Sequence, residues 1–145
     1  MFDGTLRHWH NEEYKLELKP NSTPYHAQAY PVPQVYEAQF QHEIDHLCEI
    51  GVLCKVNRSA WAAPCFIIPK KDSTVCFTTD FRELNKCVKR KPFPIPKIQD
   101  LLLKLKGFQY ATSLDLNMGY YHIELSPFSR ELCTIVLPWG KYEYQ

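Results

Sequence analysis

The chain has 145 residues and a formal net charge of +1, and its 45% hydrophobic and 23% charged residues predict one globular domain with one core. No apolar run approaches the roughly 18 residues that a membrane-spanning helix needs, so we expect no membrane association. The first residues lack the apolar core of a signal peptide, so we expect an intracellular protein, cytoplasmic or nuclear, whose six cysteines are reduced thiols. No Cys-x-x-Cys pair occurs, which argues against a structural zinc site.

The charge is unevenly spread along the chain. Residues 1–54 carry three Lys or Arg against eight Asp or Glu, a net charge of −5. Residues 55–106 carry twelve against four, a net charge of +8, and residues 107–145 carry two against four, a net charge of −2. A basic middle section predicts a localised anionic partner, with a merely solvated lysine-rich surface as the alternative.

The first 35 residues read as an irregular lead-in, because prolines interrupt any long element, with one short strand expected over residues 14–18. From Val35 the apolar residues recur at helical spacing, which predicts an amphipathic helix that closes at Gly51. Its predicted buried face consists of Tyr36, Phe40, Ile44 and Leu47.

A metal-binding pattern lies inside this predicted helix. His42, Glu43 and His46 match H-E-x-x-H, in which two His one turn apart share a zinc and the Glu acts as a base. The pattern is short and no third ligand follows it, so a polar helix face is the favoured interpretation and a zinc peptidase the weaker one.

The middle of the chain predicts a β-hairpin followed by a second helix. Residues 64–68 and 74–79 read as strands joined by a lysine-bearing turn, and residues 88–96 read as a basic extended stretch. A helix is expected to begin near Pro96, the kind of residue that suits a first helical position. Its expected buried stripe consists of Ile98, Leu101, Leu102 and Leu105.

The stretch 111–125, ATSLDLNMGYYHIEL, is the candidate centre of the chemistry. An apolar strand is expected over residues 110–116, and it would deliver the carboxylate of Asp115 to the end of a rigid sheet. One carboxylate seldom holds Mg²⁺ alone, so partners are expected elsewhere. Further strands are expected over residues 132–137 and 142–144.

Seven blocks in this order resemble the reverse transcriptase of gypsy-type LTR retrotransposons and their retroviral relatives. They are LKPNSTPYHAQAYPVP, EIDHLCEIGVL, SAWAAPCFIIPKKD, DFRELNK, PFPIPKIQDLLLKLKG, SLDLNMGYYHIEL and CTIVLPWGKYEY. The resemblance implies an α+β fold, namely the fingers and first part of the palm of a right-hand reverse transcriptase, truncated. It divides the chain into a lead-in at 1–35, similar to a protease-to-polymerase linker, and a partial reverse transcriptase domain at 36–145.

The resemblance also implies roles for the residues around Asp115. Asp115 would be the catalytic, metal-binding aspartate, with the Leu116 carbonyl as a further metal ligand and a neighbour of the nucleotide. Tyr120 would pack under the incoming sugar and exclude a ribose 2′-hydroxyl. Two-metal polymerisation needs at least two carboxylates around two Mg²⁺ ions, and Asp115 supplies one of them.

Other candidates come from the fingers-like blocks. Lys70 resembles the fingers lysine that meets the nucleotide γ-phosphate. Asp80 and Arg82 resemble residues near the template strand, and Trp61 and Pro64 match positions where packing and template-side contacts are expected. The implied partners of the parent enzyme are an RNA or DNA template–primer and deoxynucleoside triphosphates.

Departures from the family pattern point to a loss of activity. The Tyr-x-Asp-Asp motif does not occur in the chain, and Cys76 stands where the family has a second fingers arginine. A neutral thiol gives no bidentate phosphate contact. Glu131 stands where relatives commonly have lysine. We therefore expect a fragment that is inactive alone, consistent with a decayed copy, with a non-catalytic nucleic-acid-binding or domesticated module as the alternative.

Overall fold

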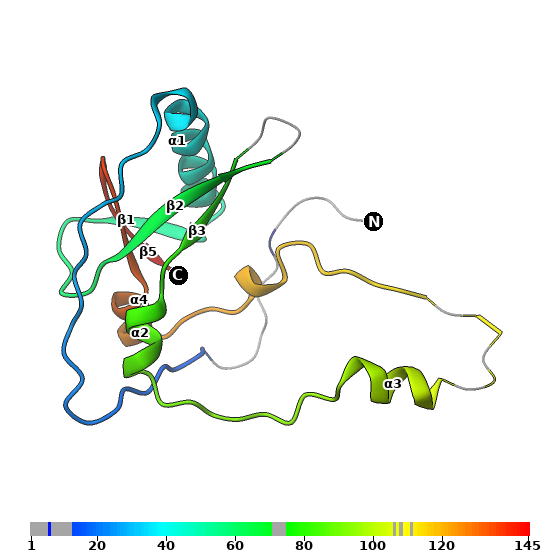
Figure 1. The fold of residues 1–145 in the computed structure, drawn as a ribbon. Coiled ribbons are helices and arrows are strands. Elements are labelled where there is room, and N and C mark those ends of the chain that lie inside the picture. The colour runs from blue at the N-terminus through cyan, green and yellow to red at the C-terminus, as the bar shows by residue number, and fades with distance from the viewer. Residues whose placement is uncertain (1–5, 7–12, 71–74, 106, 108, 111) are drawn as a thin grey trace.

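A five-stranded sheet forms the body of the molecule (Figure 1). The structure, a computed structural model, describes residues 6, 13–70, 75–105, 107, 109, 110 and 112–145. The strands are β1 (Leu53–Val56), β2 (Ala63–Pro69), β3 (Val75–Thr79), β4 (Thr134–Leu137) and β5 (Gly140–Tyr144). None of the described helices is long and apolar enough to cross a membrane.

The sheet contains two hairpins, β2–β3 and β4–β5, which are joined by parallel pairing between β2 and β4. The strand order is β1-β5-β4-β2-β3, in which β2 pairs parallel with β4 and all the other neighbours are antiparallel. The predicted hairpin is confirmed as β2 and β3, while the residues of its turn from 71 to 74 lie outside the described part of the chain. The last two predicted strands are confirmed as β4 and β5. The sequence reasoning missed β1, whose partner β5 lies far along the chain.

The helix α1 (Gln34–Glu49) packs its apolar stripe against the sheet and forms the main core. Phe40, Ile44 and Leu47 are buried as predicted, whereas Tyr36 is only half-buried. The helix ends on Gly51, whose φ of 79° lies in the left-handed region that favours glycine. Two hydrogen bonds close the last turn, from Val52 N to Leu47 O at 2.9 Å and from Gly51 N to Cys48 O at 3.1 Å.

A second, smaller core lies beside two short helices, α2 (Arg82–Cys87) and α4 (Pro127–Leu132). It consists of Trp61, Leu84, Leu132 and Cys133. Neither helix was predicted, because a stretch of six residues shows less than two turns of periodicity. Pro127 opens α4 at a first helical position, where its missing N–H leaves no donor unpaired.

The lead-in lies along the body and contacts three separated parts of it. Isolated bridges join Tyr14 to Leu125, Leu18 to Val88 and His26 to Ala62. The expected strand over residues 14–18 is therefore wrong in detail, since only its two ends pair and each has a different partner. Glu17 adds ion pairs to Lys91 at 2.6 Å and Lys89 at 3.8 Å.

Residues 89–105 and 112–118 form what we call the projecting segment, which extends away from the sheet (Figure 1). It contains α3 (Ile98–Lys104), which begins two residues after Pro96 and has no buried residue. The expected buried stripe is wrong: Leu102, for example, is 62% exposed. The expected strand over 110–116 is also wrong, because residues 110 and 112–116 have no strand structure. Both elements need a packing or pairing partner, and the described part of the chain places none beside them.

Candidate functional site

The carboxylate of Asp115 lies on the projecting segment, outside the folded body. Asp115 and Leu116 are both exposed, and within the described residues no hydrogen bond or ion pair involves Asp115. No group of three or more His, Cys, Asp or Glu in the described part of the chain could hold a metal ion. The residues present therefore do not fit a two-metal centre, which needs at least two converging carboxylates, and we assign no chemical step to this site.

Tyr120 stands where the projecting segment rejoins the body. It belongs to the 3₁₀ helix η1 (Gly119–His122), which follows Met118 in a left-handed conformation at φ 53°. A Cβ at position 119 would lie 3.0 Å from the Leu116 Cβ, so any larger residue there would crowd the Leu116 side chain. The Tyr120 ring is 90% exposed, which leaves its face open to a partner.

Lys70 and Cys76 flank the tip of the β2–β3 hairpin. Lys70 directly follows β2 and is exposed. Cys76 lies on β3, also exposed, with its thiol 3.7 Å from the Phe77 carbonyl oxygen. Position 76 thus offers solvent a neutral group where the family resemblance implies a cation.

Asp80 and Arg82 are the two candidates that the structure brings together. The Arg82 Nε donates to Asp80 Oδ1 at 2.8 Å and an Arg82 terminal nitrogen donates to Asp80 Oδ2 at 2.6 Å. The Arg82 backbone N–H also donates to Asp80 Oδ1 at 3.1 Å. This fork geometry holds the guanidinium in one orientation at the start of α2. These hydrogen bonds, first the one from the Arg82 side chain, lower the pKa of Asp80 to about 2.

We expect Asp80→Asn to lose stability at pH 7 relative to the unchanged protein, because the Arg82 pair is broken. The folded-state pKa of Asp80 lies below its ordinary value of about 3.9, so the stabilisation is present above that value and is lost as pH falls towards about 2. Urea unfolding at pH 7 and at pH 3 should show the difference shrinking at the lower pH. Asp100→Asn, on the exposed α3, is the matched control and should show no such pH-dependent difference; an equal effect there would contradict the assignment.

Trp61 and Pro64 lie inside the folded body. Trp61 is 6% exposed and packs in the second core, and its backbone N–H donates to Ser59 Oγ at 3.1 Å. Pro64 is fully buried on β2, where its carbonyl accepts the backbone N–H of Asp80 at 2.9 Å. Their contribution here is packing, and through that last hydrogen bond Pro64 helps to place the Asp80–Arg82 pair.

The zinc pattern on α1 remains a surface feature. His42 and His46 are exposed and Glu43 is half-buried. The described part of the chain provides no third metal ligand near them. Both the polar-face interpretation and the zinc-peptidase interpretation therefore stay predictions.

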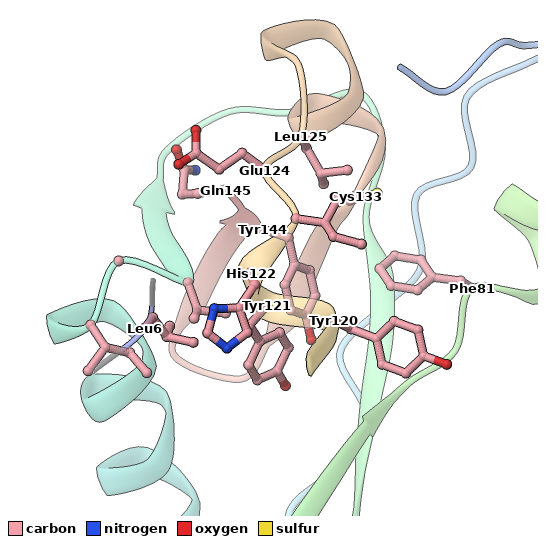
Figure 2. A pocket seen from close by; sticks show the side chains of 14 residues that line it. Leu6, Phe81, Tyr120, Tyr121, His122, Glu124, Leu125, Cys133, Tyr144 and Gln145 are labelled. Carbon is pink, nitrogen blue, oxygen red and sulfur yellow. The ribbon is translucent and has the colours of Figure 1, made fainter. Parts of the chain in front are cut away.

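Sequence reasoning missed a cavity of about 380 Å³ beside Tyr120 (Figure 2). Its walls include Phe81, Tyr121 and Tyr144, which come from the residue before α2, from η1 and from β5. The Tyr121 and Tyr144 rings stack at 6.4 Å between centroids, and Phe81 meets Tyr144 at 6.1 Å. The consecutive tyrosines after Gly119 were the available signal, but their partners are distant in sequence.

Comparison with known proteins relates the chain to retroelement proteins. No family model matches the sequence. The Tf2-3 and Tf2-4 transposon polyproteins of Schizosaccharomyces pombe are each 29% identical over 132 residues, which is 91% of this chain and 10% of the polyprotein. The chain therefore spans about a tenth of the length of the curated relatives it matches.

Solved structures relate the fold to a viral enzyme. A prototype foamy virus protease–reverse transcriptase matches 99% of this chain with a TM-score of 0.85 at 23% identity, and the match covers 19% of that protein. The foamy viral enzyme in complex with double-stranded DNA matches equally well at 19% identity, over 30% of its chain. The fold is shared with part of a foamy virus protease–reverse transcriptase. The α+β class predicted from the sequence is confirmed.

Proposed function

We propose that the chain is part of a gypsy-type reverse transcriptase whose parent carries out two-metal nucleotidyl transfer, and that alone it binds nucleic acid without polymerising. In this proposal residues 36–145 form fingers and the start of the palm, and residues 1–35 are the preceding linker. The observation that carries it is the agreement between two comparisons. Sequence similarity to transposon polyproteins covers 91% of the chain, and fold similarity to a protease–reverse transcriptase covers 99%.

Support for nucleic-acid binding comes from charge and from the structural relatives. The described residues 89–105 carry five Lys or Arg against one Asp, and all of them are exposed. An exposed basic stretch of this kind can neutralise backbone phosphates. Three of the matched foamy viral structures are complexes, two with double-stranded DNA and one with an RNA/DNA hybrid.

Support for the absence of catalysis comes from the carboxylate ligands that are available to a metal ion. Asp115 is one exposed carboxylate, whereas a site that holds two Mg²⁺ ions needs at least two carboxylates. We assign two Mg²⁺ ions and the deoxynucleoside triphosphates only to the complete parent enzyme. The non-catalytic nucleic-acid-binding module remains the second candidate, favoured by the exposure of the basic stretch.

The binding experiment is fluorescence anisotropy with a labelled RNA–DNA duplex. We expect the logarithm of the affinity to fall linearly with the logarithm of salt concentration, with a slope of about 0.9 for each phosphate contacted. At constant ionic strength, Mg²⁺ should not strengthen binding, because the described residues contain no cluster of carboxylates that could hold the ion. A flat salt response, or binding that requires Mg²⁺, would contradict the proposal.

A further inference from the structure

The lead-in is fastened to the start of the projecting segment by backbone hydrogen bonds. The Lys19 N–H donates to the Cys87 carbonyl at 2.8 Å, and the Lys89 N–H donates to the Glu17 carbonyl at 2.7 Å. These two bonds flank an isolated antiparallel bridge between the lead-in and the residue that follows α2. In Figure 1 the lead-in passes the end of α2, where the projecting segment leaves the body. The backbone therefore fixes where Glu17 lies relative to the basic residues.

Glu17 lies between two leucines that anchor the lead-in to the body. Leu16 and Leu18 both pack against the second core, and the Leu16 N–H donates to Ser129 Oγ at 2.8 Å. In an extended chain successive side chains point to opposite sides. The side chain of Glu17 is accordingly turned away from that core and is 49% exposed. The carboxylate is thus held at the surface by neighbours that are themselves packed.

The carboxylate of Glu17 faces two lysines, one with each of its oxygens. Glu17 Oε1 lies 2.6 Å from Lys91 Nζ, and Glu17 Oε2 lies 3.8 Å from Lys89 Nζ. The hydrogen bond from Lys91, and then its charge, hold the pKa of Glu17 below its ordinary value, so the carboxylate is ionised at neutral pH. An exposed ion pair is screened by salt and adds little to the stability of a fold. Its main effect here is on what the two lysines are free to contact.

The ion pairs divide the cations of the basic stretch at residues 89–105 into two groups. Two of its five Lys or Arg residues, Lys89 and Lys91, share Glu17. The other three form no ion pair within the described part of the chain. A phosphate that approaches either paired lysine also meets the negative charge of Glu17, which repels it. The stretch therefore offers a nucleic acid fewer cations than its sequence contains.

We propose that the lead-in restrains nucleic-acid binding, because the Glu17 carboxylate holds Lys89 and Lys91 and withholds them from the phosphates. The inference rests on the proposed function, since it concerns the basic residues that bind nucleic acid there. It gives a regulatory role to a residue that lies some seventy positions before those lysines. Loss of the Glu17 charge releases two further cations to the nucleic acid.

The test is fluorescence anisotropy of the full 145-residue chain with a labelled RNA–DNA duplex, over a range of salt concentrations. Glu17→Gln keeps the size of the side chain and removes its charge. We expect this variant to bind more tightly at low salt and to steepen the salt slope by about 0.9 for each released lysine. Its advantage over the unchanged chain should shrink about tenfold between about 50 mM and about 200 mM salt, because two additional phosphate contacts are lost as salt rises.

Glu13→Gln is the matched control. Glu13 also lies in the lead-in, has a similar exposure and forms an ion pair, with Arg130 at 3.9 Å. Arg130 keeps its hydrogen bonds to the Leu125 carbonyl and to Gln145 Oε1 when that pair is broken, so the control removes the same charge without releasing a cation. Its salt slope should equal that of the unchanged chain.

A double variant, Lys89→Ala with Lys91→Ala, separates the release of these lysines from a general effect of charge. In the unchanged chain it should alter the salt slope little, whereas in the Glu17→Gln chain it should remove the whole gain. Thermal unfolding confirms that each variant is folded. Equal slopes for Glu17→Gln and Glu13→Gln, or a gain that persists without the two lysines, would overturn this inference alone. Absence of salt-dependent binding in every variant would overturn the proposed function and this inference with it.

Discussion

Ile44→Ala should lower the free energy of unfolding by about 2–5 kcal/mol, the range for truncating a buried aliphatic side chain. Ile44 is 0% exposed and lies between Phe40 and Leu47 in the core that joins α1 to the sheet. Its removal leaves a cavity in the part of the molecule that holds all five strands together. Urea denaturation followed by circular dichroism measures the change.

Leu102→Ala is the matched control, since it also shortens a large aliphatic residue in a helix. Leu102 is 62% exposed on α3, so its truncation should change the free energy of unfolding by no more than about 0.5 kcal/mol. A loss comparable to that of Ile44→Ala would show that the projecting segment packs into a core in solution, contrary to the fold described above.

Replacing Arg90 and Lys97 by alanine should weaken binding of an RNA–DNA duplex and lower the salt slope by about 2. Each of these exposed cations contributes about one phosphate contact to a non-specific complex. Neither forms an ion pair within the described part of the chain, unlike Lys89 and Lys91, which share Glu17. Both are therefore available to the nucleic acid, and anisotropy at several salt concentrations measures the slope.

A second double variant with the same change in net charge tests whether the position of the two cations, rather than the total charge, determines the salt slope. Lys15→Ala with Arg58→Ala removes two exposed cations from the lead-in and from the loop before β2. This control should keep most of the salt slope. If both double variants lose it equally, the projecting segment is not the binding surface.

The elements that sequence reasoning predicted correctly carry their own local signals. The helix α1 has an apolar residue at each turn and a glycine at the position where its closing hydrogen bonds require a positive φ. The β2–β3 hairpin has two apolar runs within hairpin distance of each other. In both cases the partner of each residue lies within about twenty positions, where pattern alone is informative.

The elements that were predicted wrongly depend on contacts that the pattern does not encode. The leucines of α3 have helical spacing, yet spacing shows only that a face is apolar, and here nothing in the described structure covers that face. Likewise, β1 was missed because its four residues form a strand only through pairing with β5, some ninety residues later.

The candidate site residues also differ in whether their arrangement depends on neighbours in the sequence or on distant parts of the chain. The Asp80–Arg82 pair spans two positions in sequence and forms a tight contact. Asp115 lies on the projecting segment and Lys70 directly follows β2, and their proposed roles rest on resemblance alone. The aromatic cavity unites Phe81, Tyr121 and Tyr144, and only the three-dimensional fold brings those residues together.

The most direct test of the central claim is primer extension by the purified chain with an RNA template, a DNA primer, Mg²⁺ and deoxynucleoside triphosphates. The account predicts nucleic-acid binding without nucleotide incorporation, and no difference between the unchanged chain and Asp115→Asn. Incorporation that is present in the unchanged chain and abolished by Asp115→Asn would contradict it, because it would show that Asp115 already belongs to a complete metal site.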